Sequence, residues 1–451
     1  MSLELIIKNA RLVTENGVLD GNLGIEKGKI AGLFSVDYVP AAGHIIDAEG
    51  KIVMPGAIDA HVHIPVGNGT HRGDFTSDGK AALLGGTTTV IDFVKPQDLS
   101  LLDSFWAKKE EVAKLSPVDF AFHAVILNRK DLQDIPALVQ EGIVSFKQFM
   151  CNVDNLPGLH TGLLYETYKI LARFGATATV HAENNEIQEY LTTELKNEGR
   201  KDPLAHAESR SCLAEVEAVS RAILLAEKAG IHLHVFHVST GKAAQLIQQS
   251  REKGLKITGE TCPHYLAFTR EDMKEKGPFL QVTPSIKFPA DQKILWSNLA
   301  QGSMDIVVSD HYAPTREEKE KGWENIWLVE GGIPGIETRV PYLLNTGVLQ
   351  KRFTLERFAD IIATKPAKIF GLYPQKGALR VGADADIVIW DLEKEYEVDP
   401  ATWGHQADWT PFAGMKWKGV PVLTILRGKV MVREGRYLGQ AGYGRFVRRN
   451  Y

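Results

Sequence analysis

The stretch IVMPGAIDAHVH, residues 52–63, joins an apolar, partly β-branched run to a His-x-His pair. Such a run is typical of a buried strand. Successive side chains of a strand point to opposite faces, so His61 and His63 share one face and could bind one metal ion. A lone pair of this kind is equally typical of two hydrogen-bonded strand histidines. The interpretation therefore depends on what stands at the ends of other strands.

Strands alternate with amphipathic helices after this stretch. TTTVIDF (87–93) and LHVFHV (233–238) are typical of strands, whereas residues 213–228 carry apolar side chains at helical spacing before Gly230. Repeated strand–helix units predict an α/β fold, and a (β/α)8 TIM barrel over residues 54–375 fits their number. A doubly wound sheet is the alternative, which is disfavoured because no Gly-x-Gly-x-x-Gly motif follows the first strand.

Both ends of the chain favour short strands separated by turns that contain glycine. LII (5–7) and ARLV (10–13) occur near the start, and ADIVIW (385–390) and VLTILRGKVMV (422–432) occur near the end. We predict that residues 1–53 and 376–451 together form one small β-sandwich domain beside the barrel.

Composition gives no support for nucleic acid or membrane as a partner. The 451 residues carry a formal net charge of −4, without a block of Lys and Arg. No apolar stretch approaches the length of a membrane span, and the first residues do not resemble a signal peptide. Three widely spaced cysteines favour a reducing compartment over a disulfide framework. We expect a cytoplasmic protein.

Residues that can bind metal recur at the predicted strand ends. They are Lys147 within GIVSFKQFM (142–150), His181 after TATV, His237 and, after IVVS, Asp310. The carboxyl ends of barrel strands converge on one mouth, where such a set would suit zinc, manganese or cobalt. Each alone has an ordinary explanation, such as a snorkelling lysine, a core histidine or a loop cap. Jointly, those explanations would bury several polar side chains without partners, which is costly.

Several motifs resemble those of the cyclic-amide branch of the amidohydrolases, namely hydantoinases, dihydropyrimidinases and allantoinases. The resemblance covers nearly the whole chain and is specific for the branch. Its motifs are HVH (61–63), GGTTTVIDF (85–93), SFK (145–147), VHAEN (180–184), FHVS (236–239), GETCPHYL (259–266), SDH (309–311), KPAKIFGLYPQKG (365–377), GADADI (382–387) and GQAGYG (439–444).

The resemblance implies two divalent metal ions, with zinc first and manganese or cobalt as alternatives. Lys147 would be carbamylated by CO2, which requires a neutral amine, and would bridge both ions. A metal-bridged hydroxide would attack the carbonyl of the cyclic amide, and Asp310 would act as general base. The implied ligands are His61, His63, Lys147 and Asp310 for the first metal, and Lys147, His181 and His237 for the second.

The resemblance also implies a small cyclic ureide as substrate, a hydantoin or a dihydropyrimidine, and a homo-oligomer, either tetramer or dimer. Backbone groups around Thr283 and Gly331 would bind the ring. Asn152 stands where many relatives carry a tyrosine near the oxyanion, so it is a substrate-binding candidate or a loop cap.

Three alternatives to this function stay open. Allantoinase is the nearest. A dihydroorotase is disfavoured because Pro65 replaces the usual arginine after His-x-His, with Arg72 further along in a loop (68–75) loosely like that of hydantoinases. A non-catalytic scaffold, like the dihydropyrimidinase-related neuronal proteins, is disfavoured because every expected ligand is present.

Overall fold

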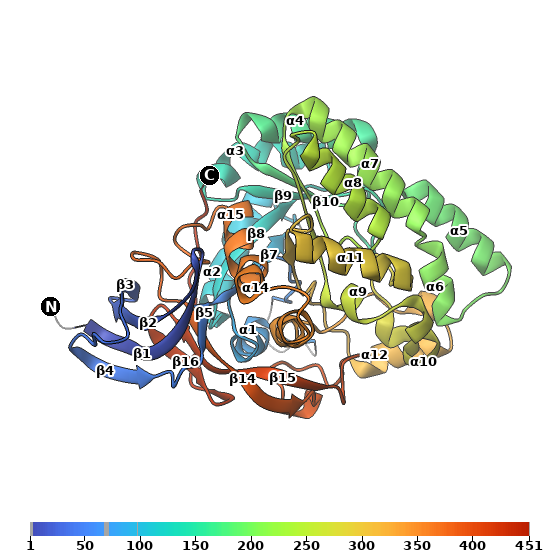
Figure 1. Ribbon diagram of the computed structural model, residues 1–451. Helices are drawn as coiled ribbons and strands as arrows, with labels where there is room; N and C mark the ends of the chain where they lie inside the picture. Colours follow the sequence, from blue (N-terminus) through green and yellow to red (C-terminus); the bar gives the residue numbers. More distant parts are fainter. Residues whose placement is uncertain (1–2, 67–71, 97, 451) are drawn as a thin grey trace.

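The computed structural model describes residues 3–66, 72–96 and 98–450. Its centre is an eight-stranded parallel sheet in which sequential strands are neighbours, as expected for a (β/α)8 barrel (Figure 1). The last strand returns to the first, because His311 forms a parallel bridge with Val62. The strands are β6 (Ala57–Asp59), β7 (Thr87–Val94), β8 (Asp119–Val125), β9 (Ser145–Phe149), β10 (Thr177–His181), β11 (His232–Val235), β12 (Ile257–Thr261) and β13 (Ile306–Val307).

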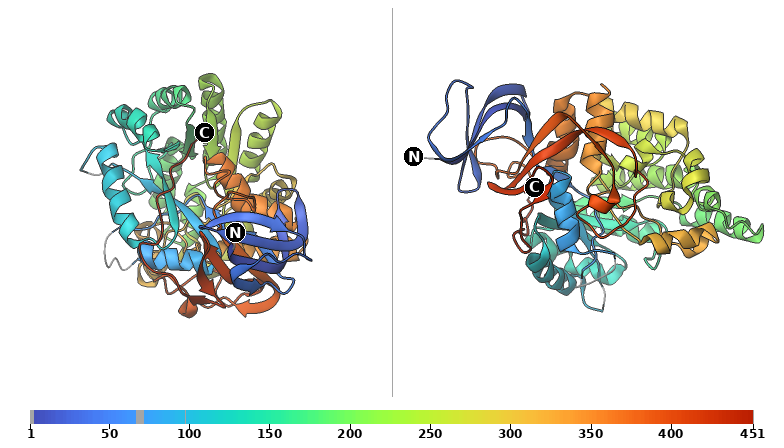
Figure 2. Two further views of the ribbon diagram at one scale, coloured as in Figure 1. Left: turned by 90° about the vertical axis from the view of Figure 1, so that its left-hand side faces the viewer. Right: turned by 90° about the horizontal axis from the view of Figure 1, so that it is seen from below.

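Helices surround this sheet, and those between successive strands pack on its outside (Figure 2). The helix predicted over residues 213–228 is confirmed as α7, which Ser211 caps at its start and Gly230, with φ 68°, ends. The helices are α1 (Phe75–Leu84), α2 (Leu101–Leu115), α3 (Ile135–Gln140), α4 (Thr161–Arg173), α5 (Asn185–Asn197), α6 (Pro203–Ser209), α7 (Cys212–Ala229), α8 (Gly241–Glu252), α9 (Pro263–Ala267), α10 (Met273–Lys276), α11 (Pro289–Gln301), α12 (Arg316–Glu320), α13 (Arg339–Leu343), α14 (Leu355–Ala359) and α15 (Lys365–Ile369).

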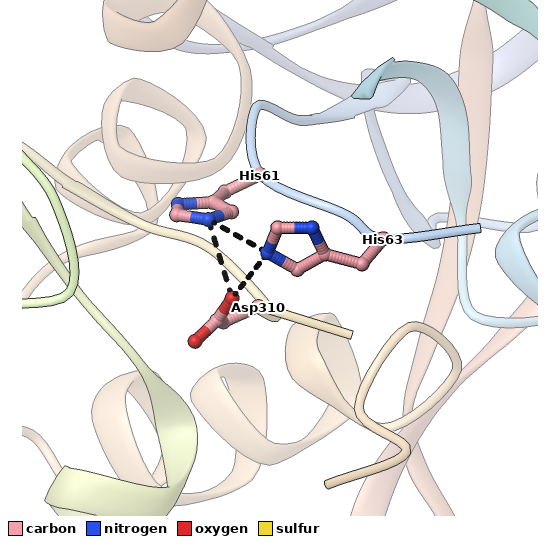
Figure 3. Close-up of side chains that lie close together, drawn as sticks. All are labelled: His61, His63 and Asp310. Atoms are coloured by element: carbon pink, nitrogen blue, oxygen red, sulfur yellow. Dashed lines mark hydrogen bonds and ion pairs between the residues drawn. The ribbon is translucent and has the colours of Figure 1, made fainter. Parts of the chain in front are cut away.

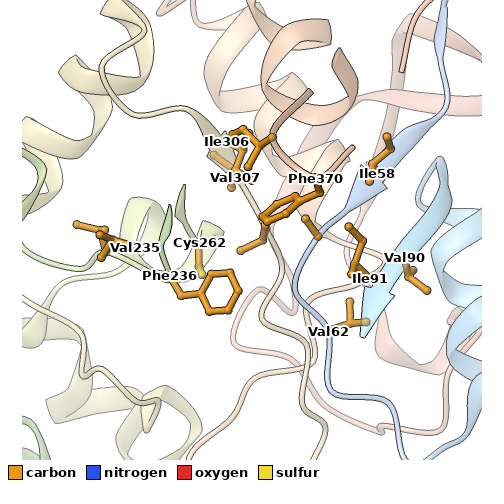
Figure 4. Close-up of a cluster of buried hydrophobic side chains, with 14 of the residues drawn as sticks. Ile58, Val62, Val90, Ile91, Val235, Phe236, Cys262, Ile306, Val307 and Phe370 are labelled. Carbon is orange, nitrogen blue, oxygen red and sulfur yellow. The ribbon is translucent and has the colours of Figure 1, made fainter. Parts of the chain in front are cut away.

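Apolar side chains from strands far apart in the sequence meet inside the molecule. Ile58 and Val62 come from the first strand region, Val90 and Ile91 from β7, and all four are buried in one continuous core (Figure 4). Burial of these groups, at about 25 cal/mol per Å² of apolar surface, supplies the main driving force for the fold. The same packing fixes the strand ends relative to one another.

A second, largely antiparallel sheet is built from both ends of the chain, as predicted. Strand β5 pairs with β1 on one side and with β14 on the other, which joins the two ends. The blue and red strands in Figure 1 show this sheet beside the barrel. Its strands are β1 (Leu3–Thr14), β2 (Gly17–Glu26), β3 (Lys29–Phe34), β4 (Ala42–Asp47), β5 (Ile52–Pro55), β14 (Ile387–Glu397), β15 (Lys416–Leu426), β16 (Lys429–Arg433) and β17 (Arg436–Tyr437).

One detail of the first strand differs from the prediction. Residues 5–7 and 10–13, expected as two strands, belong to the single strand β1, whose register shifts between Ile7 and Ala10. Asn9 lies in this irregularity with φ 54°, and its backbone N–H donates to the side chain of Asn22 at 2.9 Å. A bulge allows the strand to continue through a polar break.

Among the described residues, no helix is long and apolar enough to cross a membrane.

Candidate metal centre

Three of the predicted ligands meet at the mouth of the barrel. The Nε2 atoms of His61 and His63 lie 3.2 Å apart, and each lies 3.2 Å from Oδ1 of Asp310 (Figure 3). Tetrahedral ligands at about 2.1 Å from a zinc ion lie roughly 3.4 Å from one another. The three atoms therefore have the spacing of ligands around one metal ion.

Backbone hydrogen bonds hold this cluster together where the segment after β13 meets the segment after β6. The N–H of Asp310 donates to the carbonyl of His61 at 3.0 Å, and the N–H of His63 donates to the carbonyl of His311 at 2.8 Å. Asp310 has φ 49°, a left-handed conformation that costs a residue other than glycine about 1–2 kcal/mol. The closure of the barrel thus keeps Asp310 in an uncommon backbone conformation, which turns its carboxylate toward the histidines.

Two further predicted ligands form a second cluster. Nδ1 of His181 lies 3.0 Å from Nε2 of His237, and both side chains are buried. His237 also has a positive φ, of 35°. Its Nδ1 atom is buried and has no hydrogen-bond partner in the described part of the chain.

Lys147 lies between the clusters in an apolar and aromatic environment. Its side chain is 1% exposed, and Nζ lies 4.2 Å from the ring centre of Phe236 and 4.9 Å from that of Phe149. Burial lowers the pKa of Lys147 to about 7, although Asp310 and Glu260 act in the opposite direction. A substantial fraction of its amine is therefore neutral near pH 7, the form that can react with CO2.

Two buried carboxylates orient two of the histidines. Neither was predicted as a site residue from the sequence. Oε1 of Glu260 lies 2.5 Å from Nδ1 of His61, and Oε2 of Glu183 lies 2.8 Å from Nε2 of His181. If each carboxylate accepts an N–H, the other ring nitrogen of each histidine presents a lone pair to its cluster. Metal-binding histidines are commonly held in this way. An acidic residue at a buried position of a strand, as Glu260 is in β12, was the feature that could have indicated this role.

A cavity of about 300 Å³ connects these groups. Its lining includes Lys147 and Asp310, and also Thr283 and Gly331, which the sequence predicted as ring-binding residues. The two clusters thus open into one space that is large enough for a small cyclic molecule.

Asn152 and Arg72 are placed differently from the metal-binding candidates. The Asn152 amide donates to Glu189 at 3.1 Å and accepts from the Gly158 N–H at 2.9 Å, so it stabilises its own loop. Arg72 forms ion pairs with Glu318 and Glu330, at 2.5 and 2.7 Å. The preceding part of the hydantoinase-like loop, residues 68–71, lies outside the described residues.

Comparison with known proteins agrees with this geometry. A model of the amidohydrolase family matches residues 52–431. The L-hydantoinase of Paenarthrobacter aurescens is 37% identical over 455 residues, 99% of each chain. The chain belongs to the amidohydrolase family.

Two further amidohydrolases show how far the likeness extends. The structure of an L-hydantoinase (dihydropyrimidinase) from Arthrobacter aurescens has a TM-score of 0.95 and 37% identity, covering 99% of this chain and 100% of that one. An allantoinase from Deinococcus radiodurans is 35% identical over 97% of each chain. This amidohydrolase is therefore similar over nearly its full length to enzymes of both names, and its His61, His63 and Asp310 are candidate ligands of a divalent metal centre.

Proposed function

We propose that this amidohydrolase opens the ring of a cyclic amide, a hydantoin or a dihydropyrimidine, by metal-dependent hydrolysis. The observation that carries the proposal is the convergence of two ligand clusters on the buried Lys147 within one cavity. The same chemistry is named for the hydantoinases that share its full length.

The residues fit a pair of divalent ions, with zinc the first candidate. His61, His63 and Asp310 would hold one ion, and His181 and His237 the other, while a carbamate on Lys147 would contribute an oxygen to each. The close approach of donor atoms within each cluster supports this fit. Glu260 and Glu183 occupy the other ring nitrogens of His61 and His181, which leaves the nitrogens that face the clusters for metal ions. When bound, such ions supply Lewis acidity, which lowers the pKa of water and polarises a carbonyl.

The protein's own groups account for the remaining requirements. Asp310 would accept the proton of the attacking water and return it to the leaving nitrogen, a role supported by its position in the lining of the cavity. Burial would raise the pKa of Asp310, but the hydrogen bond with His63 and the electrostatic influence of His237 hold it below the usual range, so the carboxylate is ionised and has an oxygen that can accept a proton. Backbone groups near Thr283 and Gly331 would hold the ring and leave its substituent to the surrounding loops.

The substituent decides between the proposed activity and its nearest rival. Allantoin is itself a 5-substituted hydantoin, so an allantoinase would use the same ring contacts. A ring carboxylate, as in dihydroorotate, would need a cation, and Arg72 is already paired with two glutamates. We therefore expect hydantoin or its 5-substituted forms to exceed dihydroorotate in kcat/KM by at least roughly a hundredfold, about 2.7 kcal/mol.

A substrate panel tests this proposal. Hydantoin, 5-substituted hydantoins, dihydrouracil, allantoin and dihydroorotate would each be assayed with added zinc, manganese or cobalt. If allantoin alone is turned over, the protein is an allantoinase and the proposed hydantoinase activity is rejected. Dihydroorotate as the best substrate would show that a cation near the cavity was misjudged, and no turnover of any member would reject the activity.

A further inference from the structure

A chain of polar side chains runs through the barrel beneath the metal centre. His232 and His234 lie two residues apart on β11, and Thr258 and Glu260 lie two residues apart on the adjacent β12. Side chains at this spacing share a face of their strand. His234 and Glu260 are fully buried, in an interior that barrels usually fill with branched apolar residues.

Hydrogen bonds connect these side chains without a gap. Beginning at β10, the Oγ1 of Thr177 lies 3.1 Å from Nδ1 of His232, whose Nε2 lies 2.9 Å from Oγ1 of Thr258. This hydroxyl lies 2.8 Å from Nδ1 of His234. Nε2 of His234 lies 3.0 Å from Oε2 of Glu260, whose Oε1 lies 2.5 Å from Nδ1 of His61.

The order of donors in this chain follows from its upper end. If Nε2 of His61 keeps its lone pair for a metal ion, its Nδ1–H must donate to Glu260. Glu260 also accepts the backbone N–H of His237 at 3.3 Å, so its first oxygen is committed to two donors. Its second oxygen then accepts from Nε2–H of His234.

The same order continues to the lower end. With its proton on Nε2, His234 accepts the Thr258 hydroxyl at Nδ1. Thr258 accepts in turn from Nε2–H of His232, which accepts from Thr177 at Nδ1. Thr177, His232, Thr258 and His234 each donate once toward Glu260, which accepts from both His234 and His61, so no two protons or lone pairs oppose each other. A network satisfied in one direction is rigid, whereas a gap would leave a buried polar group without a partner, which is costly.

We propose that His232, Thr258 and His234 are positioning residues that orient Glu260 and thereby fix the tautomer of His61 and the metal affinity of the site. The inference rests on the proposed function only in taking His61 as a metal ligand. It assigns a role to side chains that touch neither the metal nor the substrate. Because affinity is its observable, it can be tested without any substrate.

The test compares metal affinity in three purified variants, measured by competition of zinc with a chelator. His234→Phe removes the donor to Glu260 and should weaken binding about 10- to 100-fold, the usual effect of losing such a partner. Thr258→Val keeps the shape but frees His234 to adopt the other tautomer, and should weaken binding by a smaller factor of about 3 to 10. Thr179→Val is the matched control. The buried Thr179 hydroxyl donates to the Phe146 carbonyl at 3.1 Å and takes no part in the series of hydrogen bonds from Thr177 to Glu260.

A folding measurement and one further variant separate a loss of metal affinity from a loss of structure. Circular dichroism and thermal unfolding would show whether His234→Phe folds; if it does not, Thr258→Val decides alone. His234→Gln retains an N–H donor and should recover part of the affinity lost in His234→Phe. The proposal is overturned if Thr258→Val binds zinc as tightly as the unmodified protein, or if Thr179→Val loses as much affinity. A failed substrate panel with these affinities shifted as expected would reject the activity and leave the positioning role intact.

Discussion

At the scale of the single residue, Asp310 combines two proposed roles, metal ligand and proton acceptor. Replacing it by asparagine keeps its size and removes the basic oxygen. We expect Asp310→Asn to lower kcat by about 10²- to 10⁴-fold, with a much smaller change in KM, because the carboxylate acts on the proton in transit. Metal content must be measured in the same preparation. A fully metallated variant with near-normal kcat would exclude Asp310 as the general base.

Lys147 offers a second test at this scale. Lys147→Ala removes the amine that would carry the carbamate, so activity should be lost. Short carboxylic acids should restore part of it, because a carboxylate can take the place of the bridging carbamate. Activity that survives the substitution without added acid would contradict a bridging role for Lys147.

The pKa of Lys147 also sets a pH dependence. Burial lowers it to about 7, so the amine is mostly protonated below this pH and mostly neutral above it. The rate at which CO2, in the presence of excess metal ion, reactivates protein that has been stripped of metal and carbamate should therefore rise about tenfold from pH 6 to pH 8, as the neutral fraction of the amine grows from about 9% to about 91%. Dissolved CO2 must be held constant. A rate that continues to rise toward pH 10 would indicate an ordinary lysine.

At the scale of the element, local sequence predicted strands better than their ends. Strand β7 closely matches the strand predicted over residues 87–93, whereas the run IVVS (306–309), which precedes Asp310, forms a strand only over Ile306–Val307. The apolar run continues past Val307, but the backbone there bonds to β6: the Ser309 N–H donates to the Asp59 side chain at 3.0 Å. Such partners lie about 250 positions away in the sequence. Local pattern carries no information about them.

The same limit explains which parts of the site could be predicted. The six proposed ligands follow from residue type and position at strand ends, which local sequence contains. The partner of His61 does not, since Glu260 meets it across 199 positions, whereas Glu183 lies only two positions from His181. For Asn152 the sequence left substrate contact and loop cap open; its amide bonds to the Gly158 N–H in its loop and to Glu189 in α5, and a substrate contact stays a prediction.

A buried lysine connects two loops that line the cavity. Nζ of Lys319, in α12, donates to the carbonyls of Gln281 and Glu330 at 2.9 and 3.1 Å. These residues lie close to Thr283 and Gly331 in the sequence. Lys319→Met should raise KM about tenfold with less effect on kcat, because it loosens ring binding and leaves the proposed ligands in place. An unchanged KM in a folded, metallated variant would show that the loops hold their positions without Lys319.

At the scale of the whole molecule, buried charges join the barrel to the second sheet. Nζ of Lys376 lies 2.7 Å from Asp119, the first residue of β8, and 2.6 Å from Asp386, which precedes β14. Lys376→Met would leave buried carboxylates without this partner and should lower the free energy of unfolding by about 3–5 kcal/mol. Urea denaturation measures this change.

A surface ion pair provides the control. Lys394 contacts Glu434 at 3.0 Å with both side chains more than half exposed, so Lys394→Met should cost at most about 1 kcal/mol. Equal urea midpoints for the Lys376 and Lys394 variants would contradict the view that the buried cluster holds the two sheets together.

Our proposal is that two metal ions, held by six side chains from five barrel strands, serve the opening of a cyclic amide. Elemental analysis of a preparation that is actively hydrolysing hydantoin tests it most directly. The account predicts two divalent ions per chain, with activity lost on chelation and regained when both are restored. Full activity with one ion or none per chain would contradict it.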